Sequence, residues 1–174
     1  MRASRGFTLI EMMTTVAVIG ILLVAGVPAM RGVIENSRIR AASESLKYGL
    51  TLARTEAVRR NTQVSFVTDV TGWQVRTVVG DEVLHQAAGT EGPGRLELAI
   101  TPAGAERVTF DSFGRVLNPN PDPDESAPIE EIDIASVTPP EASGYRPLRV
   151  QVLRGGTARL CDPAADADDP KACL

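Results

Sequence analysis

The chain has 174 residues, a formal net charge of −4, two cysteines and one histidine. The acidic balance excludes a general electrostatic attraction for nucleic acid or anionic lipid. A structural zinc site usually needs four Cys or His ligands, more than this chain offers. The sequence contains neither H-E-x-x-H nor a Walker-type glycine loop, so we expect no enzyme, no cofactor and no bound metal.

The first thirty residues combine a short basic leader with a long apolar run. Arg2 and Arg5 precede Gly6 and Phe7, and residues 12–30 carry no formal charge. A helix over residues 7–30 is long enough to cross a bilayer, which predicts a leader at 1–6 and a transmembrane helix at 7–30. Pro28 removes one backbone hydrogen bond from that helix, so we expect a kink or local melting there.

Glu11 is the exception in this apolar segment. A carboxylate in lipid costs roughly 2.5–3.5 kcal/mol or more, so such residues are rare and usually functional. An ordinary secretory signal is a poor match, because it lacks an acid in its apolar run and ends in a small-x-small cleavage site. A lipoprotein signal would need a cysteine at the cleavage site, and a plain membrane anchor needs no acid.

The segment G-F-T-L-I-E, residues 6–11, resembles the class III signal of type IV pilins and pseudopilins. The resemblance implies that prepilin peptidase cuts between Gly6 and Phe7 and that the new amino group of Phe7 is methylated. It also implies a single-pass protein of the bacterial inner membrane, with a cytoplasmic N-terminus and a periplasmic C-terminal domain, that later joins a pilus or pseudopilus. The Phe7 ammonium of one subunit could then neutralise Glu11 of its neighbour, which makes Glu11 an assembly residue.

Beyond Arg31, apolar residues recur at spacings of three and four. They predict one helical face, formed by Ile39, Ala42, Leu46, Leu50, Ala53 and Ala57. We therefore expect residues 31–61 to continue the helix in amphipathic form, with Arg59 and Arg60 in its last turn and Asn61 as its cap. The pattern L-x-x-A-R-x-E-A-V-R-R at residues 50–60 resembles the GspH/FimT branch, which contains minor pilins and minor pseudopilins.

Residues 62–174 predict a β-rich domain. Strands are expected at 63–68 and 73–79, joined by a turn, and then at 96–100 and 108–110. Further strands are expected at residues 132–134, 148–152 and 157–161, the last two joined by a turn at Gly155 and Gly156. Gly114 is interpreted as a turn glycine. The expected fold class is α+β and type IV pilin-like: one long N-terminal helix packed on an antiparallel β-rich domain.

Three features of this domain favour particular interpretations. The proline-rich segment 118–126 cannot form a central strand and predicts a long exposed loop. Every charged residue between 118 and 144 is an acid, which favours a solvated acidic surface over a calcium site, because EF-hand spacing is absent. If the leader stays in the cytoplasm, Cys161 and Cys173 lie in an oxidising compartment, where a disulfide is favoured over free thiols.

The C-terminal hairpin raises the question of DNA binding. Some FimT-type minor pilins take part in DNA uptake through a G-R-x-R element. The corresponding residues 156–159 retain one of its two arginines, Arg159, and have Thr157 in place of the other. Arg149 and Arg154 lie nearby in the sequence and could complete a patch that contacts phosphates. The acids that follow Cys161 disfavour DNA as a partner, and the alternative is that these arginines keep the hairpin soluble.

The resemblance implies a role in assembly, with other pilin or pseudopilin subunits, prepilin peptidase and the inner-membrane assembly platform as partners. We expect a minor pilin that is incorporated into a type IV pilus and primes its assembly or sits at its tip. Two alternatives stay open: an H-type minor pseudopilin of a type II secretion system, and a pilus-borne DNA receptor for natural transformation.

Overall fold

The fold begins with one long helix. A computed structural model describes residues 7–69, 72–88, 96–121, 125–137 and 144–173, and the side chains of residues 23–29, 31 and 69 lie outside that description. Helix α1 spans Leu9–Arg60; its N-cap, Thr8, accepts a hydrogen bond from the backbone N–H of Glu11 (3.3 Å). Asn61 ends the helix with a left-handed backbone, φ 50°, as a C-cap residue should. The predicted continuous helix and its cap are confirmed.

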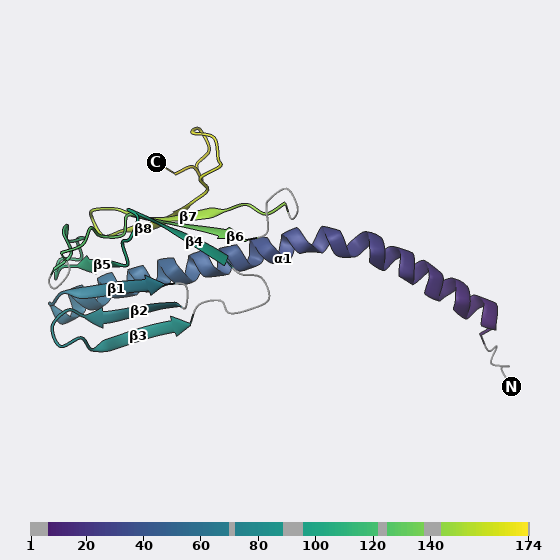
Figure 1. Cartoon of the computed structure of the whole chain (residues 1–174), viewed down its shortest axis with the longest axis horizontal. Coiled ribbons are helices and arrows are strands. Elements are labelled where there is room, and N and C mark those ends of the chain that lie inside the picture. The colour runs from purple at the N-terminus through teal and green to yellow at the C-terminus, as the bar shows by residue number, and fades with distance from the viewer. Residues whose placement is uncertain (1–6, 70–71, 89–95, 122–124, 138–143, 174) are drawn as a thin grey trace.

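The two halves of α1 have different surroundings. The C-terminal half lies along the β domain, whereas the N-terminal half extends away from it and curves (Figure 1). Helical geometry is continuous through Pro28, but the Pro28 side chain lies outside the described residues, so a kink caused by this residue stays a prediction. Over the residues with described side chains, no helix is both long and apolar enough to qualify as a membrane span.

Two four-stranded antiparallel sheets flank the C-terminal half of α1 (Figure 1). The first sheet has the order β3-β2-β1-β5 and is built from β1 (Val64–Asp69), β2 (Gly72–Thr77), β3 (Val83–Ala88) and β5 (Arg107–Phe110). The second has the order β4-β6-β7-β8 and is built from β4 (Leu96–Thr101), β6 (Glu131–Ser136), β7 (Leu148–Val152) and β8 (Ala158–Cys161). The predicted α+β, type IV pilin-like architecture is confirmed.

The core forms where α1 meets both sheets. The apolar face of α1 predicted from the sequence is buried, with Ile39, Leu50, Ala53 and Ala57 all fully enclosed. The first sheet adds Phe66 and Phe110, and the second adds Ile132, Ile134 and Val150. This burial is the main stabilising contribution, because about 25 cal/mol is gained per Å² of apolar surface removed from water.

Two expectations for the domain need correction. No strand was expected at 83–88, where β3 pairs with β2 across a register shift between Val75 and Arg76. The segment 118–126 is not simply an exposed loop, because Asn120 is only 1% exposed. The Asn120 amide donates hydrogen bonds to the carbonyl of Arg107 (3.2 Å) and to the hydroxyl of Ser126 (3.1 Å), which fastens the loop to the domain.

The chain closes on a disulfide between Cys161, the last residue of β8, and Cys173, as expected. The backbone N–H of Asp162 donates to the carbonyl of Lys171 (2.8 Å), and the Arg159 guanidinium donates to the carbonyl of Ala172 (2.9 Å). Figure 1 shows this C-terminal segment standing away from the second sheet. It is therefore a loop closed at its base rather than a free tail.

Candidate assembly and interaction sites

The described side chains in the N-terminal half of α1 form an exposed apolar surface. Phe7 is 80% exposed and Leu9 is 79% exposed, while Ile39 is the first fully buried apolar residue among the helix side chains that the structure describes. Glu11 lies one helical turn after Phe7, among these exposed apolar residues. Gly6, the residue before the predicted cut, lies outside the described residues. Large exposed apolar surfaces of this kind mark contacts with lipid or with other protein.

At the other end of α1, Glu56 forms ion pairs with two arginines of the same helix. The Arg59 guanidinium contacts both Glu56 oxygens (3.1 and 2.6 Å), and Arg60 Nε donates to Oε2 (2.8 Å). The hydrogen bonds from Arg59, and then those from Arg60, lower the pKa of the nearly buried Glu56 carboxyl from 4.5 to about 2. Glu56 is therefore ionised at neutral pH and compensated within its own helix.

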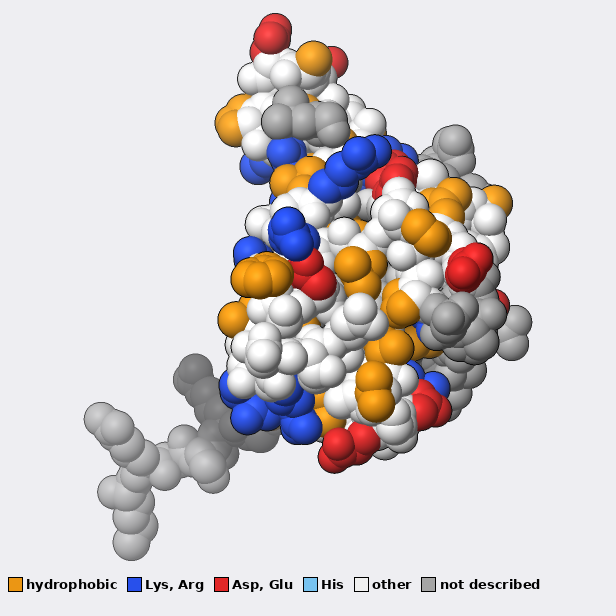
Figure 2. All heavy atoms as spheres, turned by 90° about the vertical axis from the view of Figure 1, so that its left-hand side faces the viewer, with side chains coloured by type: hydrophobic (Ala, Val, Ile, Leu, Met, Phe, Trp, Pro, Cys, Tyr) orange, Lys and Arg blue, Asp and Glu red, His pale blue; other side chains and the backbone are white. Residues whose placement is uncertain are grey.

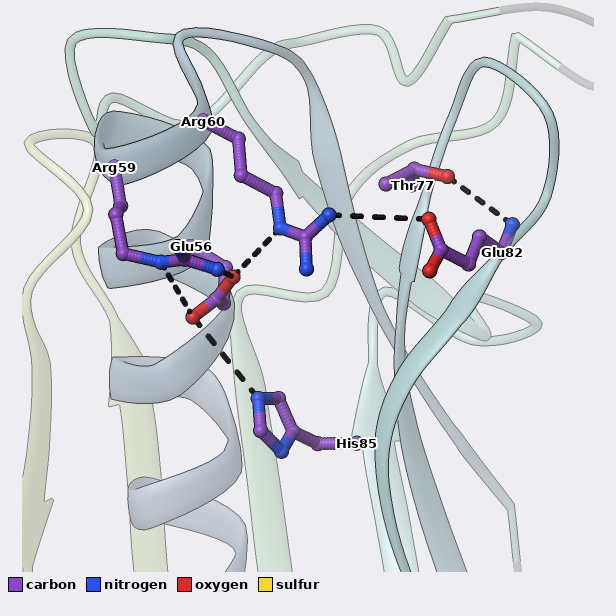
Figure 3. A network of polar contacts seen from close by, with 6 residues as sticks. All are labelled: Glu56, Arg59, Arg60, Thr77, Glu82 and His85. Atoms are coloured by element: carbon purple, nitrogen blue, oxygen red, sulfur yellow. Dashed lines mark hydrogen bonds and ion pairs between the residues drawn. The ribbon is translucent and has the colours of Figure 1, made fainter.

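The same cluster reaches the first sheet (Figure 3). His85 Nε2 of β3 lies 4.0 Å from Glu56 Oε1, and Arg60 Nη1 lies 3.8 Å from Glu82 Oε2 in the turn before β3. The backbone N–H of Glu82 donates to the Thr77 hydroxyl at 3.1 Å. These contacts connect the last turn of α1 to the β2–β3 hairpin.

Arg54 connects α1 to two turns of the domain. Its Nε donates to the carbonyl of Gly114 (3.0 Å). Gly114 and Gly156 both have left-handed φ values, 76° and 81°, and a Cβ on Gly156 would lie 1.8 Å from the Gly114 oxygen. Only glycine fits such a close backbone approach. The predicted turn role of Gly114 is confirmed, and the A-R-x-E part of the helix motif is where α1 is joined to both the β2–β3 hairpin and these turns.

Comparison with known families agrees with this geometry. Residues 42–167 match the family model described as type II transport protein GspH, and residues 1–27 match the prokaryotic N-terminal methylation motif. The chain belongs to the GspH family. This confirms the resemblance predicted from the two sequence motifs.

Two solved structures have the same fold as this GspH-family chain. The type IV minor pilin FimU of Pseudomonas aeruginosa has a TM-score of 0.56 at 17% identity, covering 78% of this chain and 96% of FimU. The minor pseudopilin EpsH of the type 2 secretion system of Vibrio cholerae has a TM-score of 0.50 at 18% identity, covering 74% of this chain and 99% of EpsH. A search of curated protein sequences gives no match.

In this GspH-family chain, the three arginines considered for DNA have different surroundings. Arg149 lies between two carboxylates, with Nε and Nη2 donating to Asp133 (2.7 and 2.8 Å) and Nη1 lying 2.8 Å from Glu131. The hydrogen bond from its side chain to Asp133 raises the pKa of Arg149 despite partial burial. Arg159 donates to the carbonyl of Ala172, whereas the Arg154 side chain is exposed. The three therefore do not form one array of free cations.

This arrangement also revises the interpretation of the acidic segment. Glu131 and Asp133 were expected to belong to a solvated acidic surface, but on β6 they hold Arg149 of the neighbouring strand β7. Among the described residues, no group of three or more His, Cys, Asp or Glu side chains could hold a metal.

Sequence reasoning did not identify His85 and Asp111 as contact residues. His85 lies in the strand that was not expected, and its contact with Glu56 joins residues distant in the sequence. Asp111 organises a turn by accepting from the backbone N–H groups of Phe113 and Arg115. The only available signal was local: Asp at the first position of a D-S-F-G turn is typical of side chains that bond the backbone two residues on.

Proposed function

We propose that this GspH-family chain is a structural filament subunit, a minor pilin that joins a type IV pilus after prepilin peptidase cuts between Gly6 and Phe7. The observation that carries the proposal is the exposed apolar half of α1, which bears Glu11 one turn from Phe7 and leads into a half packed on the domain. In this proposal the exposed half crosses the inner membrane before assembly and packs on neighbouring helices afterwards.

The proposal gives Phe7 and Glu11 complementary roles. Cleavage releases the amino group of Phe7, which is methylated and keeps its positive charge. In a helix bundle that excludes water, this ammonium neutralises Glu11 of an adjacent subunit. Removing one member of a buried ion pair costs about 3–5 kcal/mol, so the pair can set the axial register of the subunit.

A Glu11→Ala variant tests this role in the organism that carries the gene. We expect normal cleavage and membrane insertion, followed by loss of the subunit from sheared filaments, measured by mass spectrometry of the N-terminus and by immunoblotting. Glu44→Ala is the matched control, because the Glu44 side chain is 60% exposed on the domain half of the same helix. Normal incorporation of Glu11→Ala would exclude the assembly role.

A second candidate is an H-type minor pseudopilin of a type II secretion system, supported by the likeness to EpsH. Deletion of the gene distinguishes the pilus role from the secretion role. Loss of surface pili with normal secretion supports the pilus role, and retained periplasmic exoproteins with normal pili support the secretion role. DNA reception, the third alternative, gains no support from the described contacts, since Arg149 is already held by two carboxylates.

A further inference from the structure

The β6–β7 end of the second sheet lies on the side of the domain from which the N-terminal half of α1 projects (Figure 1). The backbone N–H of Arg146 donates to the side-chain oxygen of Asn36 on α1 (2.9 Å). The hydroxyl of Tyr145, which is buried, donates to the carbonyl of Ser136 (2.9 Å), whereas the Arg146 side chain is exposed. The bond to Asn36 therefore fixes the height of Arg146 along the helix.

That height is close to the end of the membrane segment. The step from Met30, the last residue of the uncharged run, to Asn36 is about 9 Å, because an α-helix rises about 1.5 Å per residue. The headgroup layer on each side of a bilayer is about 5–7 Å thick. If α1 crosses the membrane as in the proposed function, on which this inference rests, Arg146 lies near the lipid surface. Its long apolar stem can then bring the guanidinium to a lipid phosphate.

Exposed apolar side chains accompany Arg146 at this end of the domain. Val33 and Ile34 of α1 are exposed, and Val137, directly after β6, is exposed by 54%. Val33 and Ile34 continue the exposed apolar surface of α1 past the end of the uncharged run. We call Val33, Ile34, Val137 and Arg146 the proximal patch. Apolar side chains beside a cation are typical of surfaces that lie in the interface of a bilayer.

The charges around the proximal patch favour an anionic partner. On α1, Glu35 is paired with Arg38 (3.1 Å) and Glu44 with Arg40 (3.7 Å). Arg146 forms no ion pair with any residue that the structure describes, although the chain as a whole has a net charge of −4. A guanidinium binds a phosphate through two parallel N–H donors. The exposed Arg146 is therefore available to an anion from outside the domain.

Position, rather than composition, distinguishes the proximal patch. The opposite end of the domain, seen face-on in Figure 2, also shows hydrophobic side chains beside Lys and Arg. Val79 and Arg154 belong to that end, in the turns after β2 and β7. The end of α1 lies about 36 Å beyond Asn36 along the helix axis, so these turns are far from the membrane in the proposed orientation. They supply matched control positions.

We propose that the proximal patch docks the domain on the phospholipid surface of the membrane, with Arg146 bound to headgroup phosphates and Val137 in the interface. Lipid is the occupant because the patch continues the exposed apolar surface of α1 and lies near the height of the headgroups. An anionic headgroup such as phosphatidylglycerol carries a net negative charge, so it strengthens the docking. The docking holds the domain in one orientation until the subunit leaves the membrane for a filament.

A fluorescent probe at Val137 tests the docking in the full chain. Val137→Cys is labelled with the environment-sensitive dye NBD, and the native Cys161 and Cys173 do not react because they are bonded to each other. In nanodiscs of phosphatidylcholine mixed with phosphatidylglycerol, we expect blue-shifted emission and quenching by brominated lipid. The same dye at Val79→Cys, an exposed valine (78%) at the opposite end, should show neither. A Val137 probe no more protected from water than the Val79 probe overturns the proposal.

Charge reversal tests the phosphate contact. Arg146→Glu should lower the quenching of the Val137 probe several-fold, and it keeps the bond to Asn36 because that bond uses the backbone N–H. Arg154→Glu, at the opposite end, is the control and should leave the quenching unchanged. The fluorescence of Trp73, the single tryptophan, reports before labelling whether each variant stays folded. Equal quenching in the folded Arg146→Glu chain and the unmodified chain overturns the role of Arg146.

Entry into the nanodiscs is measured separately, by co-elution of the chain with lipid. A chain that does not enter them contradicts the membrane role of α1 in the proposed function, and the docking with it. A chain that enters them with its Val137 probe in water contradicts the docking alone.

Discussion

Arg54 and Gly114 are joined by a hydrogen bond of 3.0 Å from the guanidinium Nε on α1 to a backbone carbonyl in the turn after β5. That turn lies against the β7–β8 turn, because Gly156 touches Gly114 backbone to backbone. One side chain of the helix motif therefore lies against two turns, one after β5 of the first sheet and one between β7 and β8 of the second. A shorter side chain would not reach the Gly114 carbonyl, and an apolar one would not donate a hydrogen bond to it.

Arg54→Leu should therefore destabilise the domain. The substitution keeps a large side chain but leaves the half-buried Gly114 carbonyl without its charged donor, a loss of about 1.5–3 kcal/mol. Urea titration of the full chain in micelles, followed by the fluorescence of Trp73, measures the free energy of unfolding. Lys47→Leu, an exposed position on the same helix, is the control and should change it by less than about 0.5 kcal/mol.

Glu56 should make the protein sensitive to acid. Because its pKa is about 2 in the folded protein and 4.5 ordinarily, its ion pairs stabilise the fold fully above pH 4.5 and lose that effect as the pH falls towards 2. Glu56→Gln should lower stability at neutral pH and flatten the decline between these values. Urea titrations across the range measure both effects.

The matched substitution for this experiment is Glu44→Gln, which removes one carboxylate from an exposed pair with Arg40. Surface pairs of this kind contribute about 0–1 kcal/mol, so stability at neutral pH should hardly change. If Glu56→Gln shows the same pH profile as the unmodified chain, the Glu56 cluster does not govern acid stability.

The sequence predicted the parts of the fold that depend on local pattern. The apolar spacing from Ile39 to Ala57 gave the buried helix face, and the alternation at 148–152 gave β7, because both signals lie within a few residues. The strand β3 was missed since V-L-H-Q-A-A has little alternation and few β-branched residues. Its place is fixed by pairing with β2, which is a tertiary property.

The candidate site residues also divide into those that a local pattern identifies and those that depend on tertiary contacts. Gly6, Phe7 and Glu11 belong to one local motif, so its resemblance to the type IV pilin signal was enough to name them. The contact of Glu56 with His85 and the pairing of Arg149 with Asp133 could not be named in this way, because these residues meet only after the sheets have formed. Asn120 shows the converse error: a polar residue among prolines predicts exposure, yet its amide is buried against the carbonyl of Arg107.

Gly49 allows a prediction whose sign opposes helix propensity. In an exposed helix, Gly→Ala stabilises by about 1 kcal/mol. Here a Cβ would lie 2.7 Å from Phe66 Cε2 and 2.9 Å from Trp73 Cδ2, ring atoms of the packed core. Overpacking costs about 1–3 kcal/mol, so Gly49→Ala should lower the free energy of unfolding in the same urea assay. Gly155→Ala, with nothing within 4 Å, should be nearly neutral, and a stabilised Gly49→Ala chain would contradict the packing.

A substitution at Arg149 distinguishes a structural role for this residue from a role in DNA binding. Its guanidinium bonds Asp133 and Glu131 on β6, and its side chain is only 26% exposed, so it has no free donor edge comparable to that of Arg154. Arg149→Ala should leave two carboxylates of β6 unpaired and destabilise the domain by about 1–2 kcal/mol, measured by urea titration. In a low-salt gel-shift assay with the full chain, any mobility shift should be the same for Arg149→Ala as for the unmodified protein. A variant of unchanged stability that no longer shifts DNA would instead make Arg149 a phosphate contact, because a cation committed to two carboxylates cannot be lost without a structural cost.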